Sequence, residues 1–259
     1  MTWPGKFPIV RANSASEEIF QPDVILGSSL WKWHRLLDGD PALTLSSGVV
    51  TWPCKANNGE LFQFTAARRP AYSATIFNGG PGITGDGTAG ATMDWMRLSP
   101  AATVPIVQGT RPYMWVVAKR ESAPAAFQTI IGMYNGESHR LFIYHTNTGQ
   151  WQFERRTTGD NAFTNTGAAD ANSHLFETGF TTGGLNSHVV DGVGTASVGT
   201  NAVDAPISQI TIFATEISSF PGNITIAEIV ISTTEPTPLQ LTRMRAYFGS
   251  IPHYGLTIA

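Results

Sequence analysis

The chain has 259 residues, a formal net charge of −3 and only 14% charged residues, which argues against a general binder of nucleic acid or of membrane surfaces. No window approaches 18 consecutive apolar residues, so the sequence predicts no transmembrane helix. A single cysteine, Cys54, excludes an intrachain disulfide. The 26 glycines and 16 prolines favour many short strands joined by turns, which one all-β domain of this length accommodates.

The first 26 residues differ from the rest because Pro4, Pro8 and Pro22 punctuate them. We interpret residues 1–26 as an extended N-terminal arm that is either disordered or used for anchoring, and residues 27–259 as one domain. The N-terminus carries no apolar stretch typical of a secretory signal. We therefore expect synthesis in the cytoplasm without a signal peptide.

The domain is predicted to begin with strands at Leu30-Trp31 and at 48–52. The run 79–87 is rich in glycine, but it lacks the Lys-Ser/Thr pair and the strand-to-helix frame of a phosphate-binding loop. We interpret this run as a flexible surface loop.

The middle of the chain supplies most of the predicted sheet residues. Residues 113–118 are apolar on both faces, as in a central strand. Strands at 129–134 and 140–145 follow, and Asn135-Gly136 between them is a hairpin signal.

The next segments are predicted to be a strand, a loop, a hairpin and a strand. Trp151 alternates with polar neighbours, as in a strand with one wet face. The run 157–172 is polar and rich in turn residues, so we expect a loop there. Asp191-Gly192 marks a hairpin turn, and 207–215 alternates as a strand.

The C-terminal stretch carries the most complete pattern. Residues 224–231 form a β-branched run without Gly or Pro, which predicts a strand. Thr237 suits a helix N-cap, Pro238 the first helical position and Gln240 the third position of a capping box. Gly249 lies where a glycine often ends a helix.

Within that helix, Leu241, Met244 and Phe248 share one face, which we expect to pack on the core. After the helix, residues 251–256 are predicted to be a short extended return.

These motifs resemble a known fold family. Ile226-Ala227-Glu228-Ile229, the helix and Tyr254-Gly255-Leu256 resemble the closing segment of concanavalin A-like jelly-roll domains of the laminin-G/pentraxin-like type. Leu30-Trp31 and Asp191-Gly192 match further motifs of that family in the same order. The resemblance implies an all-β fold, a two-sheet antiparallel jelly-roll sandwich with one short C-terminal helix.

The chain shows no local signature of catalysis. Glucanases of the resembled fold carry an E-x-D-x-E triplet, whose alternate carboxylates lie on one strand face, and this sequence has none. Glu228 stands alone among aliphatic residues, so we interpret it as a structural carboxylate. Cys54 lacks a catalytic signature as well. We therefore expect a non-enzymatic protein, with a glycan hydrolase whose carboxylates are unrecognised as the least favoured alternative.

Metal sites have weak support. Some members of the resembled family bind Ca²⁺ through aspartates on loops, and five aspartates are available, although Asp-Gly pairs are more often turns: Asp38, Asp40, Asp86, Asp160 and Asp191. His139 and His145 are several strand rises apart, and no Cys cluster accompanies them. We assign no catalytic, cofactor-binding or metal-binding residue, and expect no cofactor, with calcium as the open alternative.

Aromatic residues give the remaining clue to function. Exposed rings stack on sugars, but the sequence cannot sort four tryptophans into core and surface: Trp31, Trp33, Trp95 and Trp151. Arg68-Arg69 and Arg155-Arg156 are expected to be solvated or paired with acids. The carbohydrate-binding residues therefore stay open.

From the resemblance and the expected cytoplasmic synthesis, we expect a structural virion protein of a tailed bacteriophage, displayed on the particle surface as a capsid decoration or tail component. The alternative is a carbohydrate-binding lectin or phage receptor-binding module. Expected partners are other virion proteins, further copies of the chain and host-surface glycans, with neither nucleic acid nor membrane insertion. Sandwich folds host many functions, so the resemblance does not choose among these.

Overall fold

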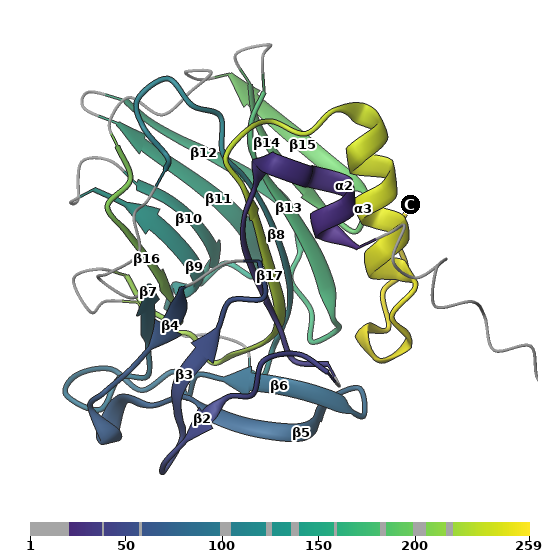
Figure 1. Cartoon of the computed structure of the whole chain (residues 1–259). Helices are drawn as coiled ribbons and strands as arrows, with labels where there is room; N and C mark the ends of the chain where they lie inside the picture. Colours follow the sequence, from purple (N-terminus) through teal and green to yellow (C-terminus); the bar gives the residue numbers. More distant parts are fainter. Residues whose placement is uncertain are drawn as a thin grey trace, which may run out of the picture.

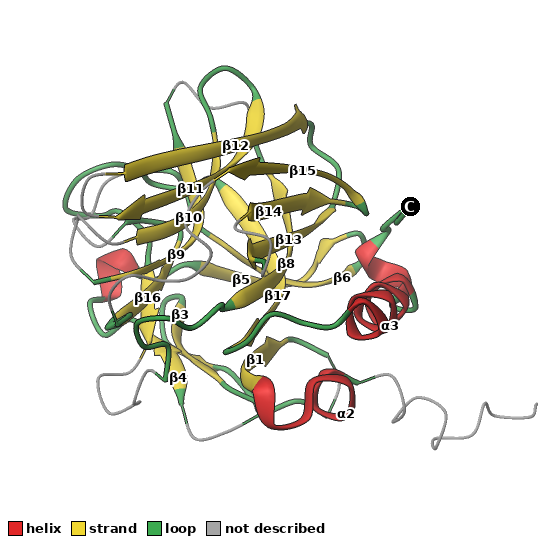
Figure 2. Ribbon diagram, turned by 90° about the horizontal axis from the view of Figure 1, so that it is seen from above, coloured by secondary structure: helices red, strands yellow, loops and turns green. Residues whose placement is uncertain are grey.

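The computed structural model describes residues 21–37, 39–56, 59–98, 105–122, 126–135, 140–157, 160–181, 185–198, 206–215 and 220–259. These residues form two antiparallel sheets packed face to face, with helices on one outer side (Figures 1 and 2). The two-sheet jelly-roll sandwich with one short C-terminal helix, predicted from the sequence, is confirmed.

The first sheet, called sheet A here, has the strand order β15-β14-β13-β8-β17-β6-β5, and β1 pairs with β17 beside β6. β8 lies between β13 and β17, as its two apolar faces predicted. The strands of sheet A are β1 (Leu30–Arg35), β5 (Ala71–Phe77), β6 (Gly80–Thr84), β8 (Tyr113–Arg120), β13 (His174–Phe180), β14 (Leu185–Val190), β15 (Val193–Val198) and β17 (Ile224–Ser232).

The second sheet, called sheet B here, has the strand order β12-β11-β10-β9-β16-β7-β4-β3-β2. In Figure 1 it occupies the left side of the molecule, with β12 at one end and the β4–β3–β2 strands at the other. Its strands are β2 (Thr44–Leu45), β3 (Val49–Pro53), β4 (Glu60–Phe62), β7 (Met96–Leu98), β9 (Gln128–Tyr134), β10 (Arg140–His145), β11 (Gln150–Thr157), β12 (Asp160–Ala168) and β16 (Gln209–Ile212).

The main core lies between the two sheets. Alternate residues of the central strands point into it, as a strand period of two requires. On β16, for example, Ile210 and Ile212 join this core, while Thr211 between them points outward. Trp52, Trp151 and other large side chains fill the interior.

A second core separates sheet A from the helices. α3 (Pro238–Gly249) and the short α2 (Pro22–Leu26) lie along the outer face of sheet A (Figures 1 and 2). Met244, Tyr247 and Phe248 of α3 are buried there against sheet residues such as Trp115 and Val230. The predicted apolar helix face is thus confirmed for Met244 and Phe248.

The start of α3 follows the predicted capping box. The Gln240 backbone N–H donates to the Thr237 hydroxyl, and the Thr237 backbone N–H donates to the Gln240 side chain. The predicted end is wrong, because Gly249 is still helical and Ser250 is the C-cap. Gly255 instead takes the left-handed conformation, with φ of 61°, after a 3₁₀ turn at Pro252–Tyr254. The predicted extended return is therefore a turn.

Two predicted loops contain strands. β12 occupies most of the run 157–172, and it pairs with β11 along its whole length. β6 occupies much of the run 79–87, where Gly82 lies beneath the Thr225 and Ile76 side chains. The polar or glycine-rich composition of these runs concealed their pairing, because tertiary contacts override weak local preference.

The structure places residues 21–26, assigned to the arm from the sequence, within the fold. α2 buries Ile25 and Leu26 in the second core, and the Gln240 side chain donates to the Ile25 carbonyl at 2.9 Å. Residues 1–20 lie outside the described residues, so the anchoring arm remains a prediction. In the described part of the chain, no helix has the length and apolar character needed to cross a membrane.

Candidate functional site

Glu228, the only carboxylate in the closing strand, lies between sheet A and the C-terminal helix. Its orientation depends on a β-bulge in β17, where Ile226 pairs with Ala118 and Glu228 pairs with the next residue, Val117. Ala227 is the extra residue, and an extra residue shifts the strand's alternation by one. The bulge therefore turns Glu228 away from the main core and towards α3.

Three donors from three segments surround the Glu228 carboxylate. Trp33 Nε1 of β1 donates to Oε1 at 2.6 Å, and the Tyr247 hydroxyl of α3 donates to the same oxygen at 2.7 Å. The Tyr254 hydroxyl donates to Oε2 at 2.5 Å. Burial raises the pKa of Glu228 to about 7, although these hydrogen bonds and the charge of Arg35 oppose the rise.

Charged residues extend this buried network towards the surface. Arg35 donates to the Tyr247 hydroxyl at 3.2 Å and forms a two-bond ion pair with Asp40 at 2.7 and 2.8 Å. Lys55 pairs with the same carboxylate at 2.9 Å. Burial alone would raise the pKa of Asp40, but the hydrogen bonds from Arg35 and Lys55 hold it below its ordinary value.

This network joins the C-terminal elements to the sheet rather than forming a reaction site. Glu228, Trp33, Tyr247 and Tyr254 are all buried in the second core, so a sugar in solution reaches none of them. The interpretation of Glu228 as a satisfied structural carboxylate agrees with this geometry. The sequence did carry a signal for the bulge, because its inward isoleucines change phase between Ile226 and Ile229.

The three calcium candidates with described side chains, Asp40, Asp86 and Asp191, accept hydrogen bonds from protein groups. Asp40 is held by Arg35 and Lys55, and Asp191 accepts from the Leu175 backbone and contacts His174 at 2.6 Å. Asp86 accepts from the Thr88 backbone at 2.8 Å, as in an Asx turn. Asp38 and the Asp160 side chain lie outside the described residues. Within the part of the chain that is described, no group of three His, Cys, Asp or Glu is arranged to hold a metal ion.

The histidines and arginines singled out in the sequence lie in different environments. His145 is buried beside Trp151, and burial and then the charge of Arg120 lower its pKa to about 4, so it is neutral at pH 7. His139 lies outside the described residues. Arg155, expected to be solvated or paired with acids, is not solvated but fully buried on the inner side of β11. Cys54 is buried and unpaired, and its Sγ accepts from the Trp33 backbone at 3.3 Å.

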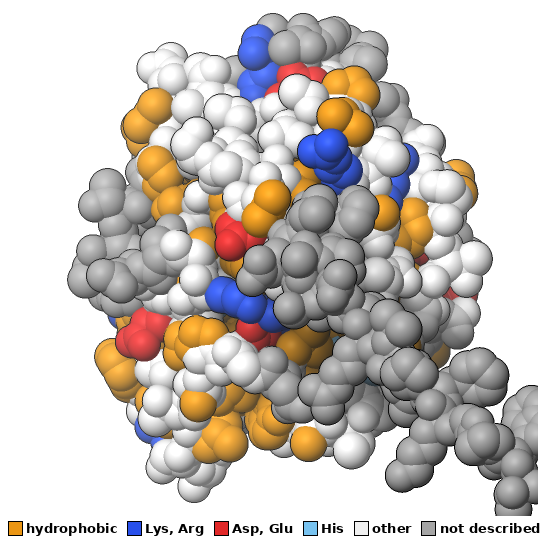
Figure 3. Space-filling view, turned by 45° about the vertical axis from the view of Figure 1, so that its right-hand side comes forward, with side chains coloured by type: hydrophobic (Ala, Val, Ile, Leu, Met, Phe, Trp, Pro, Cys, Tyr) orange, Lys and Arg blue, Asp and Glu red, His pale blue; other side chains and the backbone are white. Residues whose placement is uncertain are grey.

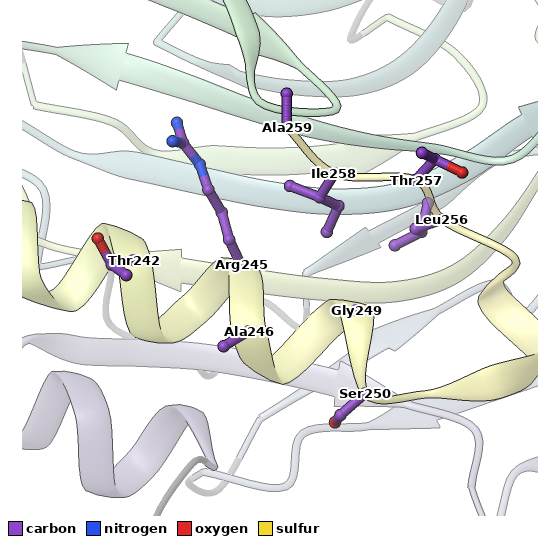
Figure 4. A pocket seen from close by; sticks show the side chains of 9 residues that line it. All are labelled: Thr242, Arg245, Ala246, Gly249, Ser250, Leu256, Thr257, Ile258 and Ala259. Carbon is purple, nitrogen blue, oxygen red and sulfur yellow. The ribbon is translucent and has the colours of Figure 1, made fainter.

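A groove of about 710 Å³ runs between α3 and the C-terminal residues (Figure 4). Leu256 and Ile258 approach it from the tail, while Arg245 extends from the helix. The Arg245 guanidinium is paired with the buried Glu177 at 2.8 Å. The groove therefore offers aliphatic surface and small hydroxyls, and its charged side chain is already neutralised.

Surface charge does not mark a site on the helix-bearing side. In Figure 3, the coloured Lys/Arg and Asp/Glu side chains form small separate groups among uncharged surface.

The structure assigns most tryptophans to the cores. Trp31, Trp33 and Trp151, which the sequence left unsorted, are buried. Trp95 is half-buried on the loop before β7. Among the described residues, aromatic rings that reach solvent therefore include the half-buried Trp95 and the exposed Phe64, Phe163 and Tyr72.

On the outer face of sheet B, one residue from each strand between β4 and β12 belongs to a continuous row, in which each residue is paired with the next across neighbouring strands. The middle of the row is covered by aromatic side chains. Phe142 packs against Tyr144, and Phe220 from a neighbouring loop packs against the Tyr144 ring. Among the described residues, exposed phenylalanines lie only near the two ends of the row: Phe64 beyond β4, 66% exposed, and Phe163 on β12, 48% exposed. The row is Phe62, Arg97, Thr211, Gly132, Phe142, Glu154 and Phe163.

The β4 end holds four side chains that we call the β4–β7 aromatic cluster: Phe62, Phe64, Trp95 and Arg97. The Phe62 and Phe64 ring centroids are 4.6 Å apart. The Arg97 guanidinium lies 5.1 Å from the centroid of Phe62 and 5.6 Å from that of Trp95, in the range of cation–π contacts. The cluster thus combines an exposed ring, a half-buried indole and a cation.

Polar side-chain contacts hold the backbone beneath this cluster. The Arg69 guanidinium donates to the carbonyls of Phe64 at 2.7 Å and Gln63 at 3.1 Å. The buried Gln63 side chain donates to the Trp95 carbonyl at 3.0 Å, which ties the β4 and β7 loops together. Phe64 is therefore an exposed ring on a well-anchored backbone.

Comparisons with known proteins identify the fold. No protein-family model matches the sequence, and no curated protein matches it. Among solved structures, Trypanosoma rangeli sialidase is similar with a TM-score of 0.58 at 12% identity, over 86% of this chain and 33% of the sialidase chain. The binding domain of botulinum neurotoxin DC, solved with rat synaptotagmin II, has a TM-score of 0.60 at 10% identity, over 86% of this chain and 52% of that chain.

The fold is shared with sialidases and neurotoxin binding domains. The botulinum neurotoxin serotype D binding domain gives a similar result, with a TM-score of 0.59 at 10% identity. This chain spans about a third of the sialidase chain and about half of the binding domains. At such identities the likeness concerns the fold alone, and it agrees with the β-sandwich part of the sequence resemblance.

These neighbours correct the prediction that the protein is not an enzyme. That prediction rested on the missing E-x-D-x-E triplet, yet chains named as sialidases share this fold. The physical reason is that a carboxylate pair serves most but not all glycosidases, and sialidases are an exception that uses a tyrosine nucleophile. The missing triplet therefore does not exclude an enzyme.

Proposed function

We propose that the protein is a lectin-like module that binds carbohydrate through the β4–β7 aromatic cluster. The observation that carries the proposal is the 66% exposure of Phe64 on a backbone held by Arg69. Burying a phenylalanine side chain is worth about 1.5–3 kcal/mol, so a large ring held in solvent marks a surface suited to a ligand. Aromatic rings of this kind present a flat apolar face to the apolar face of a pyranose.

The β4 end is favoured over the β12 end of the same sheet. Phe163 is exposed alone among the described residues near it, whereas Phe64 adjoins a second ring and leads on to Arg97 and Trp95. Binding sites combine apolar contact area with a few polar groups that fix orientation. The four-residue cluster supplies both.

The structural neighbours support a binding role by analogy. One neighbour was solved with sialic acid, and others are binding domains of neurotoxins. Because the likeness concerns the fold, their ligands are not transferred to this chain.

A glycan array probed with the labelled wild-type protein tests the proposal. We expect binding to a limited set of saccharides, and loss of that binding in Phe64→Ala. An array on which the wild-type protein binds no saccharide would overturn the proposed function.

We further propose that this module is displayed on the surface of a bacteriophage particle, as a capsid or tail component. This location is carried only by the sequence-based expectation described above. Mass spectrometry of purified particles should detect the protein at a fixed copy number per particle. Its absence from the particles would exclude this location and leave the carbohydrate-binding proposal standing.

A further inference from the structure

Arg97 differs from Arg35 and Arg245, the half-buried arginines near the second core. Arg35 and Arg245 each form an ion pair with a carboxylate, at 2.7 and 2.8 Å. Arg97 is exposed, and no carboxylate pairs with it among the described residues. Arg97 instead contacts the Phe62 and Trp95 rings.

The cation–π contacts leave the N–H groups of Arg97 available. Such a contact uses none of the five guanidinium N–H groups in a conventional hydrogen bond to an oxygen acceptor. Two of these N–H groups match the two oxygens of a carboxylate and form two parallel N–H···O bonds. The rings therefore orient Arg97 without consuming its donors.

The surroundings of the cluster add positive charge. Arg69 donates to three backbone carbonyls, from Ser46, Gln63 and Phe64, and Arg68 donates to the Ala91 carbonyl. Carbonyls do not cancel a formal charge, so both cations remain effective near Phe64.

Asp94, which adjoins Trp95 in the sequence, carries a reduced negative charge at neutral pH. Burial, followed by the charge of Asp86, raises the pKa of Asp94 to about 7, so this carboxyl beside Trp95 is partly protonated at neutral pH. The acids nearest the cluster in the chain are thus Asp94 and Glu60, two residues before Phe62 on β4, and they stand against three arginines, Arg68, Arg69 and Arg97.

We propose that the β4–β7 aromatic cluster recognises a saccharide that bears a carboxylate, with Arg97 binding the carboxylate and Phe64 stacking on the pyranose ring. This inference rests on the proposed function and names its ligand class. A neutral sugar would use the ring contact alone, so Arg97 supplies the discrimination between acidic and neutral ligands.

The test compares two probes that differ only in the charge of the carboxyl group. Trigalacturonate and its methyl ester are titrated calorimetrically into the wild-type protein. We expect the acid to bind about tenfold or more tightly than the ester, because charge-assisted hydrogen bonds are the strong class. Added salt should weaken binding of the acid and leave the ester little changed.

Substitutions assign the effect to Arg97. Arg97→Gln should reduce the affinity for the acid to that for the ester and leave the ester unchanged. Arg97→Lys keeps a cation over the rings but loses the planar fork, so we expect an intermediate affinity even where the glutamine variant folds poorly. Arg243→Gln, the same charge change at an exposed site on α3, is the matched control.

Equal binding of acid and ester by the wild-type protein would overturn the inference. An equal loss for both probes in Arg97→Gln would also overturn it, since Arg97 would then only support the rings. Phe64-dependent binding of neutral saccharides without preference for the acid would leave the proposed function intact. Failure to bind any saccharide, on the array or in solution, would remove both proposals.

Discussion

One extra residue in β17, Ala227, determines which side of sheet A the Glu228 side chain faces. Without the bulge at Ala227, the alternation that directs Ile224 and Ile226 inward would also direct Glu228 into the main core. The bulge gives the carboxylate three hydrogen-bond donors instead of an apolar environment. A buried carboxylate with these partners links three segments that are distant in sequence, which is a structural rather than a catalytic role.

The pH dependence of stability tests this account of Glu228. Its pKa is raised from an ordinary 4.5 to about 7, so the folded state holds the proton more tightly than the unfolded state does. The stabilising contribution is therefore full below pH 4.5 and is lost as pH rises to about 7. In urea denaturation, the difference in free energy of unfolding between wild type and Glu228→Gln should fall by about 2–4 kcal/mol across that range. A constant difference would contradict the raised pKa.

Glu228→Ala should lower the free energy of unfolding more than Glu228→Gln does. Glu228→Ala leaves three buried donors without an acceptor, and we expect a loss of about 3–5 kcal/mol in the free energy of unfolding at pH 6. Glu228→Gln retains one acceptor oxygen, and the Tyr254 hydroxyl can rotate to accept from the new amide, so its loss should be smaller. Equal losses in the two variants would show that the hydrogen bonds contribute little.

At the scale of single elements, the sequence predicted the helices and strands whose signals lie in residues close together in the chain. The capping box of α3 and the apolar run of β17 were found because their signals are local. β12 was missed because its inward Thr164 and Thr166 are polar, and its strand character comes from pairing with β11. The candidate site was not found because Phe62 and Arg97 meet only through the pairing of β4 with β7, and Phe64 joins them through its contact with Phe62.

The pairing of β9 and β10 depends on a glycine beneath a ring. A Cβ atom on Gly132 would overlap the Phe142 ring, which lies across β9 on the outer face of sheet B. Gly132→Ala should therefore lower the free energy of unfolding by about 1–3 kcal/mol, the usual cost of overpacking. In a Phe142→Leu background the same substitution should cost clearly less. Equal costs in both backgrounds would mean that the ring moves aside freely.

The attachment of α3 to α2 depends on Gln240. Thr237→Ala removes one cap acceptor and should cost about 1 kcal/mol of stability. Gln240→Ala also removes the hydrogen bond to the Ile25 carbonyl, so we expect a larger loss in thermal or urea unfolding. Thr242→Ala, at an exposed site on the same helix, serves as the control. A Gln240 variant as stable as Thr237→Ala would contradict the link to α2.

At the scale of the whole molecule, the two sheets present different outer faces. α2, α3 and the Glu228 network cover sheet A, and aromatic side chains close the middle of the row across sheet B. The β4–β7 aromatic cluster remains open at one end of that row, on the side of the sandwich opposite α3. The central claim is that this open end binds the ligand.

The most direct measurement is the affinity of three proteins for one saccharide selected on the array: wild type, Phe64→Ala and Phe163→Ala. Both substitutions remove an exposed phenylalanine from the sheet B side, at opposite ends of the row. We expect Phe64→Ala to weaken binding about tenfold or more and Phe163→Ala to leave it unchanged. The reverse order, or an equal loss in both variants, would contradict the assignment of the binding site to the β4–β7 aromatic cluster.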